Sequence, residues 1–325
     1  MLSNVQRLMT GDARLNSQVE GSRFDAHARN EHNGAMLRSI IRSMRPQQWV
    51  KNAFVLAPLV FAERALEPLL LTRAAIAFFL FSFAAGAVYL VNDCFDVEKD
   101  KAHPVKRLRP IPSGALPVPT AKRVAAVLSA IVVLGGLLLD WRVSLAAGSY
   151  LVLNLAYSRQ LKHMVWLDVL TIAVGFVLRI LAGAAAIAVP VSVWLVMCTF
   201  LLALYLGMGK RRHELIESEG QECRRRRVLE KYQLQHLNGA MFGTALLTVA
   251  AYTAYTLDAR VGSFHSPMLP YTIPFIILGL TRFFLLSSAT SSAASPTDRM
   301  VRDPFLLCVL AGWAGSMFYF IYGAS

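Results

Sequence analysis

Long apolar stretches occupy most of this chain, and each is close to the length of a helix that crosses a lipid bilayer. Such a helix needs roughly 20 consecutive apolar residues. Nine stretches approach this length, at residues 46–62, 69–91, 119–139, 143–158, 165–187, 191–208, 238–257, 268–287 and 304–322. Hydrophobic residues make up 55% of the 325 residues, far above the proportion in a soluble enzyme. The sequence therefore predicts an all-α polytopic membrane protein with nine transmembrane helices.

Lysines and arginines are concentrated in alternate connections between these stretches. If the amino terminus lies in the cytoplasm, 24 of the 33 Lys and Arg residues fall in segments that face the cytoplasm. These segments are residues 38–52, 93–123, 159–163, 210–231 and 282–302. The segments on the other side carry only Arg64, Arg73, Arg142 and Arg260. This bias predicts a multi-pass protein of the cell (inner) membrane with a cytoplasmic amino terminus. Nucleic-acid binding is not indicated, because the basic residues are divided among short loops.

The first 37 residues differ from the rest of the chain. Residues 1–37 are polar, mixed in charge and poor in aromatic residues, and they lack the apolar core of a signal peptide. This composition predicts a disordered cytoplasmic tail. Residues 38–325 are then expected to form one transmembrane catalytic domain. Its site is expected at the cytoplasmic end, where polar side chains of neighbouring helices gather.

Three carboxylates follow the second apolar stretch. Asp93, Asp96 and Asp100 are spaced three and four residues apart, so one helical face is predicted to carry all three. Mg²⁺ is typically bound by one or two carboxylates together with substrate phosphates. The aspartates are soon followed by three cations suited to a polyphosphate, Lys106, Arg107 and Arg109. A solvated helix end would explain these cations but not the carboxylate spacing, so the pattern predicts a site for magnesium and a diphosphate.

Two further segments place polar residues at the same level. Arg45-Pro-Gln-Gln-Trp-Val-Lys-Asn52 opens the first stretch, and Lys51 and Asn52 lie inside it, where an unpaired charge is costly. Tyr157-Ser-Arg-Gln-Leu-Lys162 closes the fourth stretch. Tyr157 and Lys162 suit either interfacial anchoring or phosphate binding, and Arg45 suits an anchor equally well.

The sixth stretch continues into Lys210-Arg-Arg-His-Glu-Leu215, where Lys210 and Glu214 share a helical face. An ordinary positive-inside loop is the alternative for this segment. The later run Arg224–Arg227 is better explained by orientation and attraction to anionic lipids. In the fifth stretch, Asp168 and Arg179 lie about three turns apart, roughly 16 Å, on one side of a helix. A charge within a membrane span is a functional hypothesis by default, although Arg179 could equally satisfy a backbone carbonyl.

Taken together, these residues carry a family resemblance. Asn92-Asp-x-x-Asp96-x-x-x-Asp100 resembles the first signature of the UbiA intramembrane prenyltransferase superfamily. Most members carry a second Asp-rich motif after the sixth span, whereas this chain has Lys210-Arg-Arg-His-Glu-Leu215 there. Together with the Arg45–Asn52 and Tyr157–Lys162 segments and His103-Pro-Val-Lys-Arg-Leu-Arg-Pro110, this departure resembles the decaprenyl-phosphate phosphoribosyltransferase branch. The resemblance covers roughly residues 38–322.

That resemblance implies a UbiA-like bundle and an activity. The activity is magnesium-dependent transfer of 5-phosphoribosyl from phosphoribosyl pyrophosphate to a polyprenyl (decaprenyl) phosphate, which releases diphosphate and serves synthesis of cell-wall arabinan precursors. Asp93, Asp96 and Asp100 would hold Mg²⁺, with Asn92 orienting them. The remaining implied contacts to the donor or to the lipid phosphate are Lys51, Lys106, Arg107, Arg109, Tyr157, Lys162, Lys210 and Arg211, with Glu214 orienting the last two. Asp93, Asp96, Lys210 and Arg211 would be catalytic, and a homo-oligomer is compatible with the sequence.

Electrostatics favours the exchange of carboxylates for cations in the sixth-span motif. An acceptor that is itself a lipid phosphate would be repelled by carboxylates and is attracted by Lys210 and Arg211. Two alternatives stay open at this point. One is a prenyltransferase that moves an isoprenoid from its diphosphate to an aromatic or glycerol-phosphate acceptor. The other is an anion transporter or channel, which is disfavoured because only Arg179 lies deep inside a span.

Overall fold

The computed structural model describes residues 34–217, 231–258, 268–288 and 299–323, with the exception of residue 301. Every regular element in these ranges is a helix, which confirms the predicted all-α class. Of the predicted tail, only residues 34–37 lie within the described ranges, and they belong to a helix at residues 34–44. The Arg224–Arg227 run lies outside the described residues.

Seven of the described helical segments are long and apolar enough to cross a membrane. Five are single helices, namely α3 (Pro68–Phe95), α5 (Val118–Leu139), α7 (Leu167–Ala186), α8 (Val193–Glu217) and α9 (Leu234–Leu257). The other two spans, Leu269–Ser288 and Pro304–Gly323, combine helices. Their elements are η6 (Leu269–Thr272) with α10 (Ile273–Ser288), and α12 (Pro304–Phe318) with η7 (Tyr319–Gly323).

The predicted count of nine is thus not reproduced among the described residues. The first apolar stretch forms a 3-10 helix, η1 (Pro46–Val55), and a short helix, α2 (Ala57–Phe61). Pro58 lacks an N–H and cannot continue the helical hydrogen bonding of the residues before it. The fourth stretch forms α6 (Trp141–Arg159), which packs in the bundle between α5 and α7. Its polar residues make it less apolar than the seven spans.

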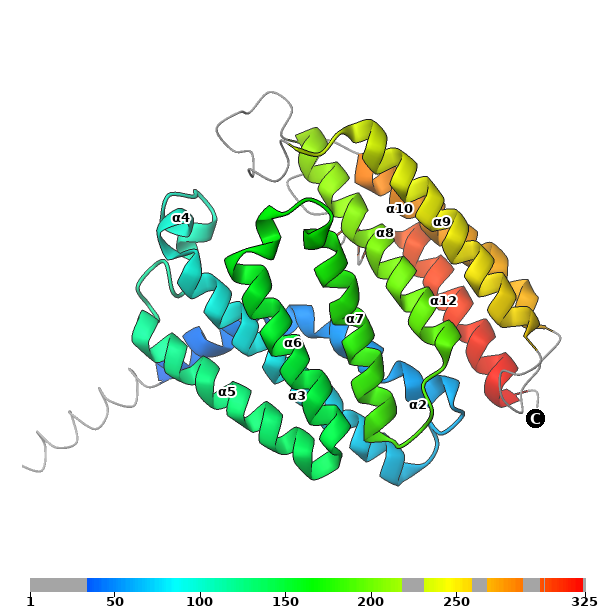
Figure 1. The fold of residues 1–325 in the computed structure, drawn as a ribbon, viewed down its shortest axis with the longest axis horizontal. Coiled ribbons are helices and arrows are strands. Elements are labelled where there is room, and N and C mark those ends of the chain that lie inside the picture. The colour runs from blue at the N-terminus through cyan, green and yellow to red at the C-terminus, as the bar shows by residue number, and fades with distance from the viewer. Residues whose placement is uncertain (1–33, 218–230, 259–267, 289–298, 301, 324–325) are drawn as a thin grey trace, which may run out of the picture.

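The helices form one bundle in chain order, with α3, α5, α6 and α7 on one side and α8, α9, α10 and α12 on the other (Figure 1). The connection from α3 through α4 (Val97–Lys101), the connection from α6 to α7 and the carboxyl end of α8 lie at the same end of the bundle (Figure 1). The α5–α6 and α7–α8 connections lie at the opposite end. Within the described residues, the α3–α5 connection, the α6–α7 connection and the carboxyl end of α8, which the sequence assigns to the cytoplasm, therefore share one end.

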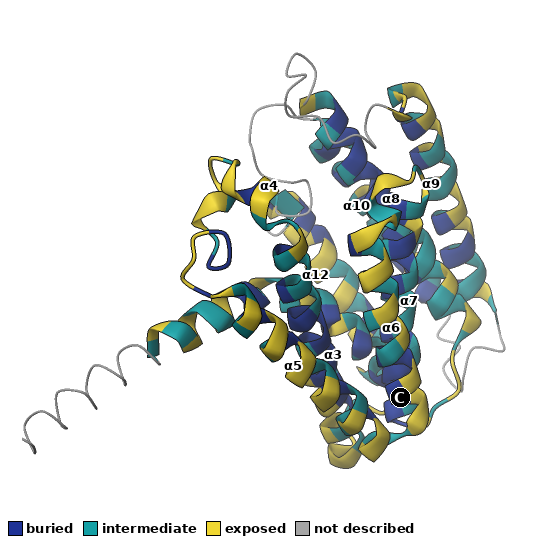
Figure 2. Ribbon diagram, turned by 60° about the vertical axis from the view of Figure 1, so that its left-hand side comes forward, coloured by how far each residue is buried: buried dark blue, intermediate teal, exposed yellow. Residues whose placement is uncertain are grey.

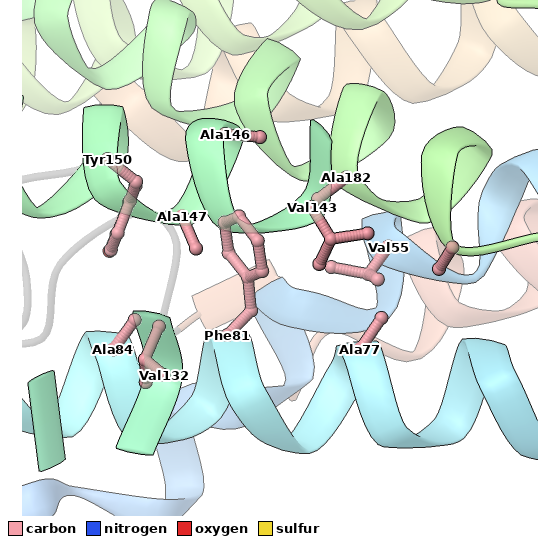
Figure 3. Close-up of a cluster of buried hydrophobic side chains, with 11 residues drawn as sticks. Val55, Ala77, Phe81, Ala84, Val132, Val143, Ala146, Ala147, Tyr150 and Ala182 are labelled. Atoms are coloured by element: carbon pink, nitrogen blue, oxygen red, sulfur yellow. The ribbon is translucent and has the colours of Figure 1, made fainter. Parts of the chain in front are cut away.

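Small residues allow close packing of the first half of the bundle. In Figure 3, Phe81 points from α3 toward Ala147 of α6. The same buried cluster contains Val55, Ala77, Ala84, Val132, Val143, Ala146, Tyr150, Ala182 and Ala186. At Gly183 of α7 the approach is closest, because an added Cβ would lie only 1.9 Å from the Val55 carbonyl oxygen. Glycine at this position lets η1 lie directly against α7.

Exposed residues lie on the outer faces of the helices (Figure 2), and many of them are large apolar residues. Leu138 on α5 is 89% exposed and Phe242 on α9 is 74% exposed. Exposed apolar side chains on this scale are unfavourable in water and suit contact with lipid tails. In contrast, 56% of the apolar windows of α3 and α7 is buried inside the molecule, so these two helices form its centre.

Candidate active site at one end of the bundle

The three predicted aspartates lie where α3 ends, but they do not share one continuous helix. Helix α3 ends at Phe95 and α4 begins at Val97, so the chain bends at Asp96. The backbone N–H of Asp96 still donates to Asn92 (3.0 Å), and that of Asp100 donates to Asp96 (2.8 Å). The expectation of a single helical face is corrected accordingly. Asp93 and Asp100 are buried, and Asp96 is half-buried.

Two arginines neutralise the buried aspartates. Nη1 of Arg109 lies 3.2 Å from Oδ1 of Asp93 and 2.6 Å from Oδ2 of Asp100, so it bridges the two carboxylates. Nη2 of Arg45 lies 2.5 Å from the same Oδ1 of Asp93. Arg45 precedes η1 with a left-handed backbone (φ 53°), and its guanidinium stacks over Tyr89. Asp93, Asp100 and Arg109 are therefore brought together, with Arg45 as an additional member.

The third aspartate connects this cluster to α6. Nζ of Lys162, in the short helix η3 (Leu161–His163), lies 2.9 Å from Oδ1 of Asp96. Tyr157 lies half-buried near the end of α6 and interacts electrostatically with Arg211 of α8. Both residues of the predicted Tyr157–Lys162 segment thus face other parts of the predicted site.

At the end of α8, the predicted cation Arg211 is already neutralised. Its side chain is 1% exposed, and its Nε lies 2.6 Å from Oδ2 of the fully buried Asp168. Glu214 forms a second ion pair with the same guanidinium. Oδ1 of Asp168 accepts hydrogen bonds from the Tyr232 hydroxyl (2.7 Å) and the Val169 N–H (2.9 Å). Burial, followed by this bond to Asp168, raises the pKa of Tyr232 far above its ordinary value.

Arg45 and Asp168 were not among the predicted site residues. Asp168 does carry a signal, since it is a carboxylate at the start of a span and at the level of the predicted basic site residues. Arg45 precedes Pro46 at the start of the first apolar stretch, which is equally typical of an interfacial anchor. Its left-handed backbone and its contact with Asp93, 48 residues away, are not readable from the sequence.

The remaining predicted residues differ in exposure. Lys51, Lys106 and Lys210 are half-buried, whereas Arg107 is exposed. Lys106 begins the short helix η2 (Lys106–Leu108), next to the Arg109 bridge. The side-chain oxygen of Asn92 is buried and has no hydrogen-bond partner within the described part of the chain. An amide oxygen cannot donate to a carboxylate, so the orienting role of Asn92 stays a prediction.

The donor atoms of this cluster fit magnesium. Asp93, Asp96 and Asp100 offer only oxygen, as does the unsatisfied carbonyl of Asn92, and Mg²⁺ prefers oxygen ligands. The ion pairs described above engage one oxygen of each carboxylate. Among the described residues, no three His, Cys, Asp or Glu side chains form a ready-made metal cage. Such a cage is not needed where substrate phosphates complete the coordination.

Comparison with known proteins assigns the family. The UbiA prenyltransferase family matches residues 52–211. A decaprenyl-phosphate phosphoribosyltransferase from Mycobacterium tuberculosis is 32% identical over 289 residues, which cover 87% of this chain and 94% of that protein. This chain belongs to the UbiA prenyltransferase family. The enzyme of the same name from Mycolicibacterium smegmatis is 30% identical over 307 residues, covering 88% of this chain and 93% of that protein.

A solved structure of the family has the same fold. A UbiA homolog from Archaeoglobus fulgidus bound to DMAPP and Mg²⁺ superposes with a TM-score of 0.67 at 17% identity, covering 87% of this chain and 99% of that one. Family membership and the seven apolar helices together identify this UbiA-family chain as a multi-pass membrane protein.

Proposed function

We propose that this UbiA-family chain transfers the 5-phosphoribosyl group from phosphoribosyl pyrophosphate to a polyprenyl phosphate such as decaprenyl phosphate, for synthesis of cell-wall arabinan precursors. The observation that carries the proposal is the similarity to decaprenyl-phosphate phosphoribosyltransferases over nearly the whole length of both chains. The basic segment at the end of α8, where Asp-rich motifs are usual in the family, supports the same acceptor.

The reaction needs positioning more than acid–base chemistry. A phosphate oxygen of the lipid forms a bond to the anomeric carbon of the ribose. The bond from that carbon to the diphosphate breaks, and the diphosphate leaves with the electron pair. A phosphate monoester is already ionised at neutral pH, so no strong general base is required. The site must bring two anions together and stabilise the leaving diphosphate.

Side chains at the end of α3 are assigned to the donor. Asp93, Asp96 and Asp100 would hold Mg²⁺, which when bound supplies positive charge to the leaving diphosphate. Arg109 lies against Asp93 and Asp100, and Lys106 is close to it in the chain. A guanidinium that already contacts these carboxylates is well placed to contact phosphates that share a metal with them.

Side chains of η1, α6, η3 and α8 are assigned to the substrate phosphates beside the aspartates. The proposed contacts are Lys51, Tyr157, Lys162 and Lys210. Lys162 already lies 2.9 Å from Asp96. Arg211 differs from these residues, because Asp168 and Glu214 both neutralise it. We therefore assign Arg211 to holding the end of α8 in place and Lys210 to contact with substrate.

The charge distribution supports an orientation for this site. The end of α3, the α6–α7 connection that contains Lys162, and the carboxyl end of α8 lie at the end of the bundle whose connections carry most of the lysines and arginines. By the positive-inside rule, this end faces the cytoplasm of a cell whose inner membrane holds the protein. A water-soluble sugar diphosphate would then reach the site from the cytoplasm, and the lipid acceptor would reach it from the membrane.

A donor-by-acceptor assay tests the proposal. Purified protein is supplied with labelled phosphoribosyl pyrophosphate and decaprenyl phosphate, or with a prenyl diphosphate and an aromatic or glycerol-phosphate acceptor, each with and without Mg²⁺. We expect a ribosylated lipid only in the first arm with Mg²⁺. Activity confined to the prenyl diphosphate arm would overturn the proposal in favour of an isoprenoid transferase.

A matched pair of aspartate variants tests the site within the same assay. Asp93→Asn should lower turnover by about 100-fold or more, because the carboxylate that would hold the metal is lost. Asp140→Asn is the control, since Asp140 accepts a hydrogen bond from the Arg142 N–H at the start of α6 and asparagine can replace it there. Equal turnover in the two variants would remove Asp93 from the site.

A further inference from the structure

The buried arginines of this chain differ in how their charge is compensated. Arg211 has two carboxylate partners. Arg179, in α7, is 7% exposed, and its partners are all neutral. Its Nε donates to Oδ1 of Asn52 (2.8 Å), its Nη2 to the Tyr150 hydroxyl (3.0 Å) and its Nη1 to the Gly175 carbonyl (2.8 Å). Within the described part of the chain, no carboxylate forms an ion pair with it.

An uncompensated guanidinium inside a membrane span is costly. Two aromatic rings offset part of this cost, since Arg179 stacks over Tyr150 (4.7 Å) and lies 5.2 Å from the ring centre of Phe176. The Gly175 contact fulfils one expectation from the sequence, that Arg179 satisfies a backbone carbonyl. None of these contacts supplies a negative charge. A charged residue inside a membrane span is by default a functional-site hypothesis, which for an arginine points to a bound anion.

The hydrogen-bonding capacity of the group also points to an anion. A guanidinium has five N–H donors, and three contacts are made here, so donors remain on Nη1 and Nη2. The Tyr150 hydroxyl accepts from Arg179, which leaves its own proton to donate. Asn52 occupies only the Nε donor through its Oδ1, and its amide nitrogen donates to Ser82 (3.1 Å). Several convergent donors suit a ligand with several anionic oxygens.

Helix η1 connects Arg179 to the aspartate cluster. Arg45, which precedes η1, lies against Asp93 and over the Tyr89 ring. Asn52, within η1, accepts a hydrogen bond from Arg179. In the proposed reaction, each substrate carries a phosphate monoester: the donor has a 5-phosphate in addition to its diphosphate, and the lipid has its single phosphate.

We propose that Arg179 and the Tyr150 hydroxyl bind a phosphate monoester carried by one of the two substrates. This inference rests on the proposed function. It adds a deep arginine to the phosphate contacts already proposed for Lys51, Tyr157, Lys162 and Lys210. The group would hold one end of a substrate while the aspartate cluster holds the leaving diphosphate.

A purely structural arginine provides the matched control. Arg73 in α3 also binds only neutral groups, donating to the Ala186 carbonyl (2.6 Å) and the Leu139 carbonyl (2.8 Å). These carbonyls close the carboxyl ends of α7 and α5, where the helix dipoles supply partial negative charge. Arg73 therefore joins helix ends at the far end of the bundle and needs no ligand.

The test compares ligands that differ by one phosphate. Equilibrium binding to the full chain is measured for phosphoribosyl pyrophosphate against its analogue without the 5-phosphate, and for decaprenyl phosphate against decaprenol. For one pair, Arg179→Gln should lower the preference for the phosphorylated ligand by about 10- to 100-fold, with the other pair unchanged. The affected pair identifies which phosphate is bound. Arg179→Lys should lose less, Tyr150→Phe about 5-fold, and Arg73→Gln nothing.

If Arg179→Gln leaves the preference for the phosphorylated ligand unchanged in both pairs, the inference is overturned. Arg179 then only connects η1, α6 and α7. If that variant does not fold, Arg179→Lys and Tyr150→Phe decide, and unchanged preferences in both overturn it equally. Failure of the proposed function looks different, because the wild type itself would then make no ribosylated lipid. If the wild type transfers phosphoribosyl but the variants keep their ligand preferences, this inference is overturned and the proposed function stands.

Discussion

At the scale of single residues, ion pairing separates two cations that the sequence presents as equals. Lys210 and Arg211 are neighbours at the end of α8, and both suit a lipid phosphate. The structure gives Arg211 two carboxylate partners and buries it, whereas Lys210 is half-buried. A guanidinium that leaves two carboxylates to bind a phosphate would strand the fully buried Asp168 without a countercharge. Losing this countercharge would lower the stability of the protein. We therefore expect Arg211 to hold the site in place and Lys210 to bind a substrate phosphate.

Alanine at Arg211 should therefore affect mainly stability, and alanine at Lys210 mainly substrate binding. Arg211→Ala should lower the free energy of unfolding by about 3–5 kcal/mol, because it leaves Asp168 buried and unpaired. Lys210→Ala should change stability by less than about 1 kcal/mol and raise KM for the donor or the lipid by about 10-fold. Thermal unfolding in detergent and steady-state kinetics measure the two effects.

A double-mutant cycle with Asp168→Asn and Arg211→Gln provides the control for this pair. The double variant should lose less stability than the sum of the two single losses, and the difference should be a coupling of about 1 kcal/mol or more. Additive losses would show that the pair does not stabilise α7 against α8. Unchanged kinetic constants in Lys210→Ala would exclude Lys210 from substrate contact.

At the scale of elements, hydropathy and spacing predicted the long helices but not their interruptions. Apolar stretches near bilayer length correspond to α3, α5 and α7 to α9, because burial in lipid depends on local composition. The bend at Asp96 and the 3-10 geometry of η1 depend on tertiary contacts. Lys162 forms an ion pair with Asp96. Arg45, just before η1, contacts Asp93, and Asn52, within η1, contacts Arg179. No local pattern encodes those partners.

The packing of η1 on α7 gives an element-scale prediction. Gly183→Ala would place a methyl group 1.9 Å from the Val55 carbonyl oxygen, and neither backbone can withdraw without moving its element. We expect a loss of about 1–3 kcal/mol of stability or more, with reduced turnover because Lys51 and Arg45 shift with η1. Unfolding in detergent and the transfer assay measure both.

Gly148→Ala is the matched control for that substitution. An added Cβ on Gly148 of α6 meets nothing within 4 Å, so the higher helix propensity of alanine should stabilise the protein by up to about 1 kcal/mol. Similar effects of the two substitutions would contradict the close approach of η1 and α7.

At the scale of the whole molecule, charge bias and topology agree. The sequence assigned alternate connections to one side, and the bundle places the α3–α5 connection, the α6–α7 connection and the end of α8 at one end (Figure 1). Aspartates and lysines from helices far apart in the chain meet there, as in the contact of Asp96 with Lys162. Topology therefore explains why residues whose mutual contacts were unpredictable could still be assigned to one site.

The orientation of this end relative to the cytoplasm can be measured with single cysteines. In a variant whose four cysteines are replaced by serine, and which retains transfer activity, Ser113→Cys should react with a membrane-impermeant maleimide only in inside-out vesicles. Ser113 is exposed in the α4–α5 connection. Arg142→Cys, exposed at the start of α6 at the opposite end, should react only in right-side-out spheroplasts. The reverse pattern would place the aspartate cluster outside, away from a cytoplasmic sugar diphosphate, and labelling of both cysteines from one side would contradict the arrangement of α5 and α6 across the membrane.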